Sequence, residues 1–256
     1  MTVVLLHGLG GESSQPLSLF APVIPPTVTV VAPDVRAHGS STVVGSAADF
    51  SLANLADEVA LALLAAGHAS TPLTLIGISM GAAIALRLAL DERLDVREAV
   101  FVRPAFTDSG LPPNLRPFPV IAQLLADHGA VEGERRFRTG AVFARAAAES
   151  PVGADALLQQ FRSPLAVERS RRLVEIPRNR AWSDASEPAA VTARTAVVAA
   201  IGDPVHPVAV ARRWAELLHD PEYAEVPSRD AGYGAQVAAV RRSVTAFLGW
   251  DAASTR

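Results

Sequence analysis

Five short runs of continuous apolar residues, separated by stretches of helical periodicity, limit what this chain can fold into. The runs are Thr2–Leu6, Val28–Ala32, Leu73–Ile78, Ala99–Val102 and Thr195–Ile201, and each is closely followed by Gly, Pro or Asp. Such runs are typical of buried parallel strands that are covered on both faces. The alternation of strands with helices therefore predicts an α/β fold with a doubly wound, mostly parallel sheet.

Helical patterns fill the intervals between these runs. Predicted helices follow Ser51, begin near Met80 and Pro207, and cover Gln236–Leu248 at the end of the chain. Serine is a good residue before a helix because its hydroxyl accepts a hydrogen bond from a free backbone N–H. Proline in the first turn costs nothing, since that N–H has no partner in the helix.

One long stretch breaks the alternation. Residues 104–188 show no convincing strand and carry several prolines between short helical segments such as Val120–Asp127 and Ala154–Phe161. We expect residues 1–103 and 189–256 to form the α/β core, and residues 104–188 to form a helical cap insertion over one end of the sheet.

Charge and composition narrow the class of partner. The formal net charge is −3 at pH 7 and there is no cysteine. The charge balance argues against nucleic acid as a partner, and the missing thiols exclude disulfides and a cysteine nucleophile. The arginines of the insertion, among them Arg169 and Arg172, are expected on a solvated helix surface. The first apolar run is too short for a signal peptide or a membrane span, so we expect a cytoplasmic protein with no membrane partner.

The strongest chemical signal is the segment Gly77-Ile78-Ser79-Met80-Gly81, between a predicted strand and a predicted helix. A Gly-x-Ser-x-Gly turn in this position is sharp and strained, and it holds the serine hydroxyl above the end of the strand. The glycines are needed because a Cβ would clash with the neighbouring backbone. Ser79 is therefore the candidate nucleophile.

Two further loops follow predicted strands. The segment from His7 to Gly11 reads His-Gly-Leu-Gly-Gly, a glycine-rich turn that can aim backbone N–H groups at a developing oxyanion. The N–H groups of Leu9 and Met80 are the candidate donors. The second loop carries Asp203, whose carboxylate can orient an imidazole and stabilise its protonated form.

Together these motifs resemble the α/β-hydrolase superfamily, of the esterase, lipase and haloperoxidase-like kind with a helical cap. The segment from Asp34 to Ser40 is similar to another motif of that family. The resemblance implies an α/β-hydrolase fold, with Ser79 as nucleophile, Asp203 as acid, and Leu9 and Met80 at an oxyanion hole. It implies a loop-packing role for His38.

The chain departs from the family pattern at the catalytic histidine, which the family places after the last strand. Residues 226–236 contain no histidine. Gln236 is our candidate for the residue in that position, with Tyr233 second. A glutamine cannot accept a proton, so the serine would lack a base. Four explanations stay open: an introduced substitution, a natural pseudo-enzyme, a different histidine as base, or a different acid.

Two residues belong to those last explanations. His206 lies three residues after Asp203, near enough in a turn to bond to it, but we rank it below Gln236. Asp108, after the strand that ends near Val102, is the candidate for a different acid, although it does not supply a base.

The sequence thus predicts a serine hydrolase that cleaves a small or medium ester, lactone or amide through an acyl-enzyme on Ser79. Activity is impaired if no other base serves. The partner is a small-molecule acyl substrate, and no cofactor, metal or nucleic acid is expected. The alternatives are a non-catalytic ligand-binding or sensor protein and a cofactor-free, non-hydrolytic activity. Residues expected around the substrate are His7, Gly8, Leu9, Met80, Val205, Phe106, Phe118 and Phe137.

Overall fold

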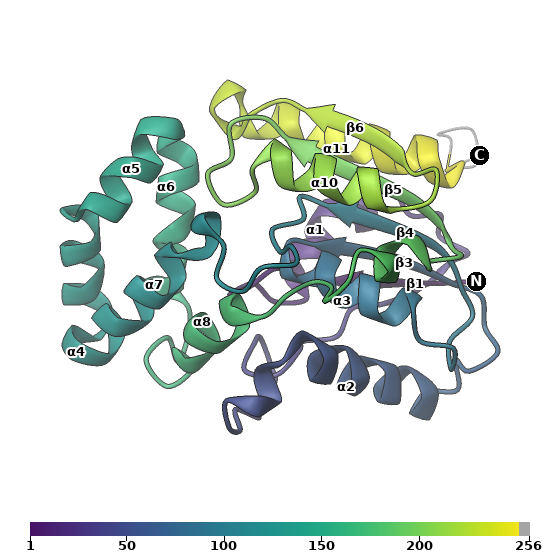
Figure 1. Ribbon diagram of the computed structural model, residues 1–256, viewed down its shortest axis with the longest axis horizontal. Coiled ribbons are helices and arrows are strands. Elements are labelled where there is room, and N and C mark those ends of the chain that lie inside the picture. Colours follow the sequence, from purple (N-terminus) through teal and green to yellow (C-terminus); the bar gives the residue numbers. More distant parts are fainter. Residues whose placement is uncertain (251–256) are drawn as a thin grey trace.

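The computed structural model describes residues 1–250 and contains a six-stranded sheet in the order β2-β1-β3-β4-β5-β6 (Figure 1). The strands are β1 (Thr2–Leu6), β2 (Thr29–Val31), β3 (Leu73–Ile78), β4 (Val96–Val102), β5 (Arg194–Ala200) and β6 (Glu222–Val226). Every neighbouring pair is parallel, so the carboxyl ends of all six strands lie at one edge of the sheet. The predicted α/β fold with a mostly parallel sheet is confirmed.

Helices cover both faces of this sheet, and further helices form the insertion between β4 and β5. In chain order the helices are α1 (Ser14–Phe20), α2 (Leu52–Ala65), α3 (Met80–Ala89), α4 (Pro117–Arg138), α5 (Ala141–Glu149), α6 (Pro151–Leu157), α7 (Gln159–Arg162), α8 (Arg171–Glu175), α9 (Ser186–Ala189), α10 (Val208–Leu217) and α11 (Tyr233–Leu248). Helices α2, α3 and α10 pack on one face, and α1 and α11 pack on the other. As predicted, the hydroxyl of Ser51 accepts a hydrogen bond from Asn54 N at the start of α2.

The central strands are largely apolar because both of their faces are buried, and the charged residues Arg97, Glu98 and Arg194 lie near the beginnings of β4 and β5. In β1, Val4 and Leu6 join the apolar cluster under α2 and α3, while Val3 and Leu5 join the cluster under α11. Successive side chains of a strand point to opposite faces, so a run without polar residues fits a strand between two helical layers. This packing fixes the ends of the strands, and with them the loops that form the site.

The strand β6 was not predicted from the sequence. Its sequence, EYAEV, carries two glutamates, and only Val226 at its end is buried. It lies at the edge of the sheet and pairs with β5 alone. An edge strand needs no continuous apolar run, so the pattern that predicted the other strands does not detect it.

Between β4 and β5 the described chain forms helices and no strand, as predicted (Figure 1). The predicted segment Val120–Asp127 lies within α4, whose helical path is interrupted at Gly129 with φ 71°. The predicted segment Ala154–Phe161 is divided between α6 and α7. The limits of 104–188 for this insertion stay a prediction. No helix within residues 1–250 has the length and apolar character needed to cross a bilayer.

Two arginines of the insertion correct an expectation. Arg169 and Arg172 are buried rather than solvated. Arg172 donates to the carbonyl of Ala37, and Arg169 donates to the carbonyls of Gly39 and Ser41. Carbonyl groups of a loop without regular structure need such donors when they are enclosed. The two side chains thus fasten the insertion to the loop after β2.

Candidate active site

Ser79 occupies the sharp turn between β3 and α3, with a positive φ of 58° and ψ of −111°. Residues other than glycine adopt this conformation only under strain. The flanking glycines make the turn possible. A Cβ at Gly77 would lie 2.2 Å from the carbonyl oxygen of Gly81, and a Cβ at Gly81 would lie 2.3 Å from that of Leu6. The predicted reason for both glycines is therefore confirmed.

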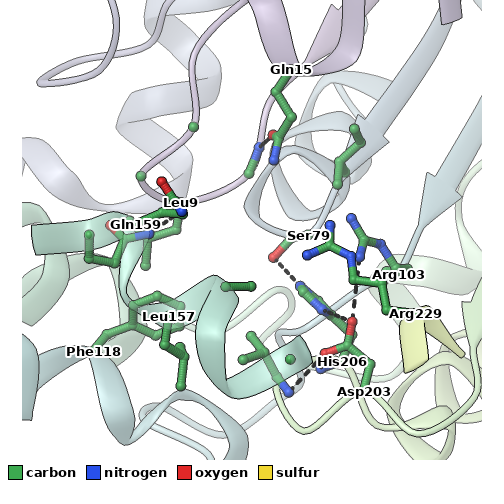
Figure 2. A pocket seen from close by; sticks show the side chains of 18 of the residues that line it. Leu9, Gln15, Ser79, Arg103, Phe118, Leu157, Gln159, Asp203, His206 and Arg229 are labelled. Atoms are coloured by element: carbon green, nitrogen blue, oxygen red, sulfur yellow. Dashed lines mark hydrogen bonds and ion pairs between the residues drawn. The ribbon is translucent and has the colours of Figure 1, made fainter. Parts of the chain in front are cut away.

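The imidazole of His206 contacts this serine (Figure 2). Its Nε2 lies 2.8 Å from Ser79 Oγ, and its Nδ1 lies 2.9 Å from Asp203 Oδ2. The three side chains thus form an unbroken hydrogen-bonded series of hydroxyl, imidazole and carboxylate. A series of this kind can supply a nucleophile, a base for it and an acid that orients the base.

A single turn after β5 supplies both the acid and the imidazole. Asp203 Oδ1 accepts hydrogen bonds from the backbone N–H groups of Val205 at 3.0 Å and His206 at 3.1 Å. Gly202 begins the turn with a positive φ of 64°. Oδ1 of Asp203 therefore stabilises the turn, while Oδ2 contacts the imidazole of the residue three positions later.

The protonation states suit general base chemistry. Burial lowers the pKa of His206 below its ordinary value of 6.5, although the Asp203 carboxylate opposes this shift. Burial also acts against ionisation of Asp203, but its interactions with His206, with the charge of Arg103 and with the backbone N–H of Val205 outweigh it and hold the pKa of Asp203 well below its usual range. At neutral pH the acid is a carboxylate and the imidazole is neutral. The proton of the ring then lies on Nδ1, facing Asp203, and Nε2 is left to accept from Ser79.

The structure corrects the expectation for Gln236. Its side chain is buried, and its Nε2 donates to the carbonyl of Pro227 at 3.0 Å. It does not line the cavity that contains Ser79. Tyr233, the second candidate, does not line that cavity either, and it is 61% exposed. The place beside the serine is taken by His206.

His206 was considered from the sequence and ranked too low. The decisive signal was its spacing from Asp203, which permits a turn that closes on the aspartate side chain. Asp108 has no part in the series, because the carboxylate that contacts the imidazole is that of Asp203.

The glycine-rich loop after β1 lies across the cavity from His206 (Figure 2). The N–H of Gly11 bonds to the carbonyl of Gly8 at 2.9 Å, and the N–H of Gly8 bonds to Gln15 Oε1 at 2.8 Å. These bonds close the loop and leave Leu9 in the wall of the cavity. Met80 is the first residue of α3, where a backbone N–H has no acceptor within the helix.

Four of the residues expected around the substrate, His7, Met80, Phe106 and Phe137, do not line the cavity that contains Ser79. His7 is buried behind the loop, where Nδ1 bonds to the carbonyl of Gly8 at 2.9 Å and Nε2 accepts from Val35 N. Burial lowers the pKa of His7, so the ring is neutral and serves the packing of two loops. Phe106 is also buried, and its carbonyl accepts from Trp214 Nε1. Gly8 and Val205 do line the cavity.

The cavity above Ser79 has a volume of about 280 Å³. Both the strand ends and the insertion form its walls. The apolar part includes Leu9, Ile78, Phe118, Ala156, Leu157 and Val205. Phe137 packs against Phe143 and Phe161 instead. The expected apolar wall is therefore only half of the cavity, and the other half is polar and carries Arg103 and Arg229 (Figure 2).

His38 has the packing role that was expected. Its ring is fully buried, and the centre of the ring lies 4.8 Å from that of the His7 ring. Its Nδ1 bonds to the carbonyl of Arg36. Burial lowers the pKa of His38 well below the usual value. Within residues 1–250, no group of three or more histidine and carboxylate side chains is placed to hold a metal ion.

Comparisons with known proteins agree with this architecture. A family model described as the alpha/beta hydrolase fold matches residues 2–228. A hydrolase from Pseudomonas aeruginosa has a TM-score of 0.70 at 17% identity, over 97% of this chain and 89% of its own. A thermophilic esterase from Thermogutta terrifontis has a TM-score of 0.69 at 18% identity, over 96% and 90%. A meta-cleavage product hydrolase from Pseudomonas fluorescens has a TM-score of 0.70 at 18% identity, over 97% and 90%. No curated protein matches the chain in sequence.

Proposed function

This chain belongs to the alpha/beta hydrolase fold family, and from that membership and the geometry of its site we propose that it is a serine hydrolase. Its substrate is a small or medium carboxylic ester, lactone or amide. The observation that carries the proposal is the series Ser79–His206–Asp203, with hydrogen bonds of 2.8 and 2.9 Å.

The reaction begins with the hydroxyl of Ser79. Nε2 of His206 takes its proton as the oxygen attacks the substrate carbonyl, and the carboxylate of Asp203 stabilises the imidazolium that forms. The imidazolium then returns the proton to the leaving alcohol or amine, and an acyl-enzyme remains on Ser79. A water molecule, deprotonated by the same imidazole, releases the acid and restores the serine.

The negative oxygen of each tetrahedral intermediate needs donors that are already in place. The backbone N–H groups of Leu9 and Met80 are our candidates, one from the loop after β1 and one from the start of α3. Removing a single donor of this kind costs roughly 10²–10³ in rate in enzymes of this chemistry. The N-terminal end of α3 adds a favourable dipole at the same point.

The alternative of a non-catalytic binding or sensor protein rested on the absence of a base. The neutral imidazole beside Ser79 removes that argument. A cofactor-free, non-hydrolytic activity would use the same residues, but nothing in the cavity favours it over attack on a carbonyl. We therefore retain hydrolysis as the single proposed function.

A serine-reactive fluorophosphonate tests the proposal directly. We expect stoichiometric labelling at Ser79, read by intact mass and peptide mapping, and no labelling of the Ser79→Ala variant. His206→Ala should label far more slowly. His219→Ala is the matched control, because His219 is exposed beyond the end of α10. Equal labelling rates for wild-type protein and His206→Ala would contradict the proposed base.

A further inference from the structure

Two guanidinium groups lie in the polar wall of the cavity that contains Ser79 (Figure 2). Arg103 directly follows β4, and Arg229 belongs to a short turn, Arg229–Ala231, that follows β6. The two residues thus come from distant parts of the chain and meet at the carboxyl edge of the sheet. Neither takes part in the proton transfers described above.

Arg103 is held firmly in this wall. It is 9% exposed, its backbone N–H donates to the carbonyl of Val198, and its φ is positive at 49°. Its Nη1 lies 3.4 Å from Asp203 Oδ2. That same oxygen also meets His206, so the single negative charge of Asp203 is shared between a guanidinium and an imidazole.

Arg229 has no such counter-ion. Among residues 1–250, no carboxylate lies within ion-pair distance of it, and its Nε is enclosed without a hydrogen-bond partner. The ring of Tyr233 lies 5.4 Å from its guanidinium carbon. The adjacent carboxylate, that of Asp230, is engaged elsewhere, with Ser150 Oγ at 2.5 Å and Val152 N at 3.1 Å.

The charges of the cavity wall therefore do not balance. The wall carries the cations Arg103 and Arg229 and the anion Asp203, while His206 is neutral. One positive charge is left over in a partly enclosed space, where an unpaired ion is costly. Guanidinium groups present paired N–H donors that match the two oxygens of a carboxylate.

We propose that Arg103 and Arg229 form a subsite for a carboxylate group, so that the preferred substrate is an ester, lactone or amide that also carries a single negative charge. The surplus of one positive charge fits a monoanion better than a doubly charged phosphate. The cavity of about 280 Å³ suits an ester, lactone or amide in which the carboxylate and the reacting carbonyl are joined by a short chain. This inference rests on the proposed hydrolase function, and its test separates the two.

The first experiment compares matched substrates. In the first pair, monomethyl glutarate carries a carboxylate on the acyl side and methyl pentanoate is its neutral counterpart. In the second pair, para-acetoxybenzoate carries a carboxylate on the leaving group and its methyl ester is the neutral counterpart. We expect kcat/KM to be higher for the charged member of one pair by about tenfold or more, as for a charge-assisted hydrogen bond. If neither pair shows a preference although the neutral esters are hydrolysed, the subsite is wrong and the hydrolase proposal stands.

The second experiment removes the free charge. Arg229→Gln should reduce the ratio of charged to neutral kcat/KM by about tenfold, and Arg229→Lys should restore part of it. Arg242→Gln is the matched control, since Arg242 is an exposed arginine on α11. An unchanged ratio in Arg229→Gln would overturn the assignment.

A binding measurement keeps the subsite testable without turnover. Calorimetry with the Ser79→Ala protein and monomethyl glutarate should give an affinity that falls about tenfold when Arg229→Gln is added. Methyl pentanoate should bind more weakly than monomethyl glutarate. If the wild-type protein is not labelled by the fluorophosphonate, but the Ser79→Ala protein still binds monomethyl glutarate more tightly than methyl pentanoate, the hydrolase proposal is contradicted and the subsite is supported. Equal affinities for the two esters would contradict the subsite.

Discussion

His206 Nε2 lies 2.8 Å from Ser79 Oγ although 127 positions separate the two residues. The contact depends on two turns that are each set by their own strand, β3 for the serine and β5 for the imidazole. β4 lies between these two strands, and because all three are parallel and end at the same edge of the sheet, they bring the turns together without any residue from the segment after β6.

Removal of the imidazole should abolish most of the activity. For His206→Ala we expect kcat toward a p-nitrophenyl ester to fall by about 10³–10⁴ or more, because the hydroxyl loses the base that takes its proton. The far-UV circular dichroism should be unchanged. His219→Ala should retain normal turnover, and a similar loss in that control would point to a general effect of histidine removal.

The pH profile should be shifted toward acid. Burial lowers the pKa of His206 below 6.5, so the ring stays neutral, and able to accept a proton, at pH values where a free histidine is already charged. We expect the acid limb of kcat/KM for a neutral ester to have its midpoint below pH 6.5. A midpoint at or above that value would show that the ring is protonated more easily than its surroundings imply.

Substitution of Gln236 should bring no gain in rate. The sequence alone suggests that Gln236→His would supply a missing base, but the side chain is buried and bonded to Pro227 O. We expect turnover of a p-nitrophenyl ester at or below that of the wild type, together with a loss of stability of about 1–3 kcal/mol from an enclosed polar group that loses its partner. Turnover kinetics and chemical denaturation measure the two effects. A rate increase by orders of magnitude would return Gln236 to the position of the base.

The strain at Ser79 should be visible in stability. Ser79→Gly and Ser79→Ala both remove the hydroxyl, but only glycine accepts a φ of 58° with a ψ of −111° without penalty. Such strain costs of order 1–3 kcal/mol, and the glycine variant avoids it. Part of that gain is offset because glycine gives the unfolded chain more conformational freedom. We expect the glycine variant to be more stable than the alanine variant by about 1 kcal/mol. Denaturant unfolding of the two proteins gives the difference, and a more stable alanine variant would contradict the strain.

Much of the fold could be predicted because strands that are buried on both faces have a continuous apolar sequence. The runs at β1 and β3 match the observed strands residue for residue, and the glycines around Ser79 have the steric reason that was inferred. The edge strand β6 could not be found, since an exposed strand needs no apolar run. Helices of the insertion were found only in part, because short segments between prolines carry little periodicity.

The site was harder to predict because it depends on which loops meet in space. Ser79 and Asp203 were identified from motifs that fix their own local structure. The candidate base, His206, was ranked too low because the position that the family gives to its histidine was given more weight than the ability of a turn to close on an aspartate side chain. Arg103 and Arg229 were not identified, because neither belongs to a sequence motif. Only the folded sheet places both at the same cavity.

The placement of Asp203 and His206 in one turn has a consequence for how this protein can diversify. The proposed acid and base, Asp203 and His206, lie within six consecutive residues, Gly202–Pro207, that follow the end of a single strand. In the proposed mechanism the loop beyond β6 takes no part in proton transfer. Mutations in that loop can therefore change substrate selectivity while Ser79, Asp203 and His206 keep their positions. Directed evolution of new preferences should accordingly begin at that loop.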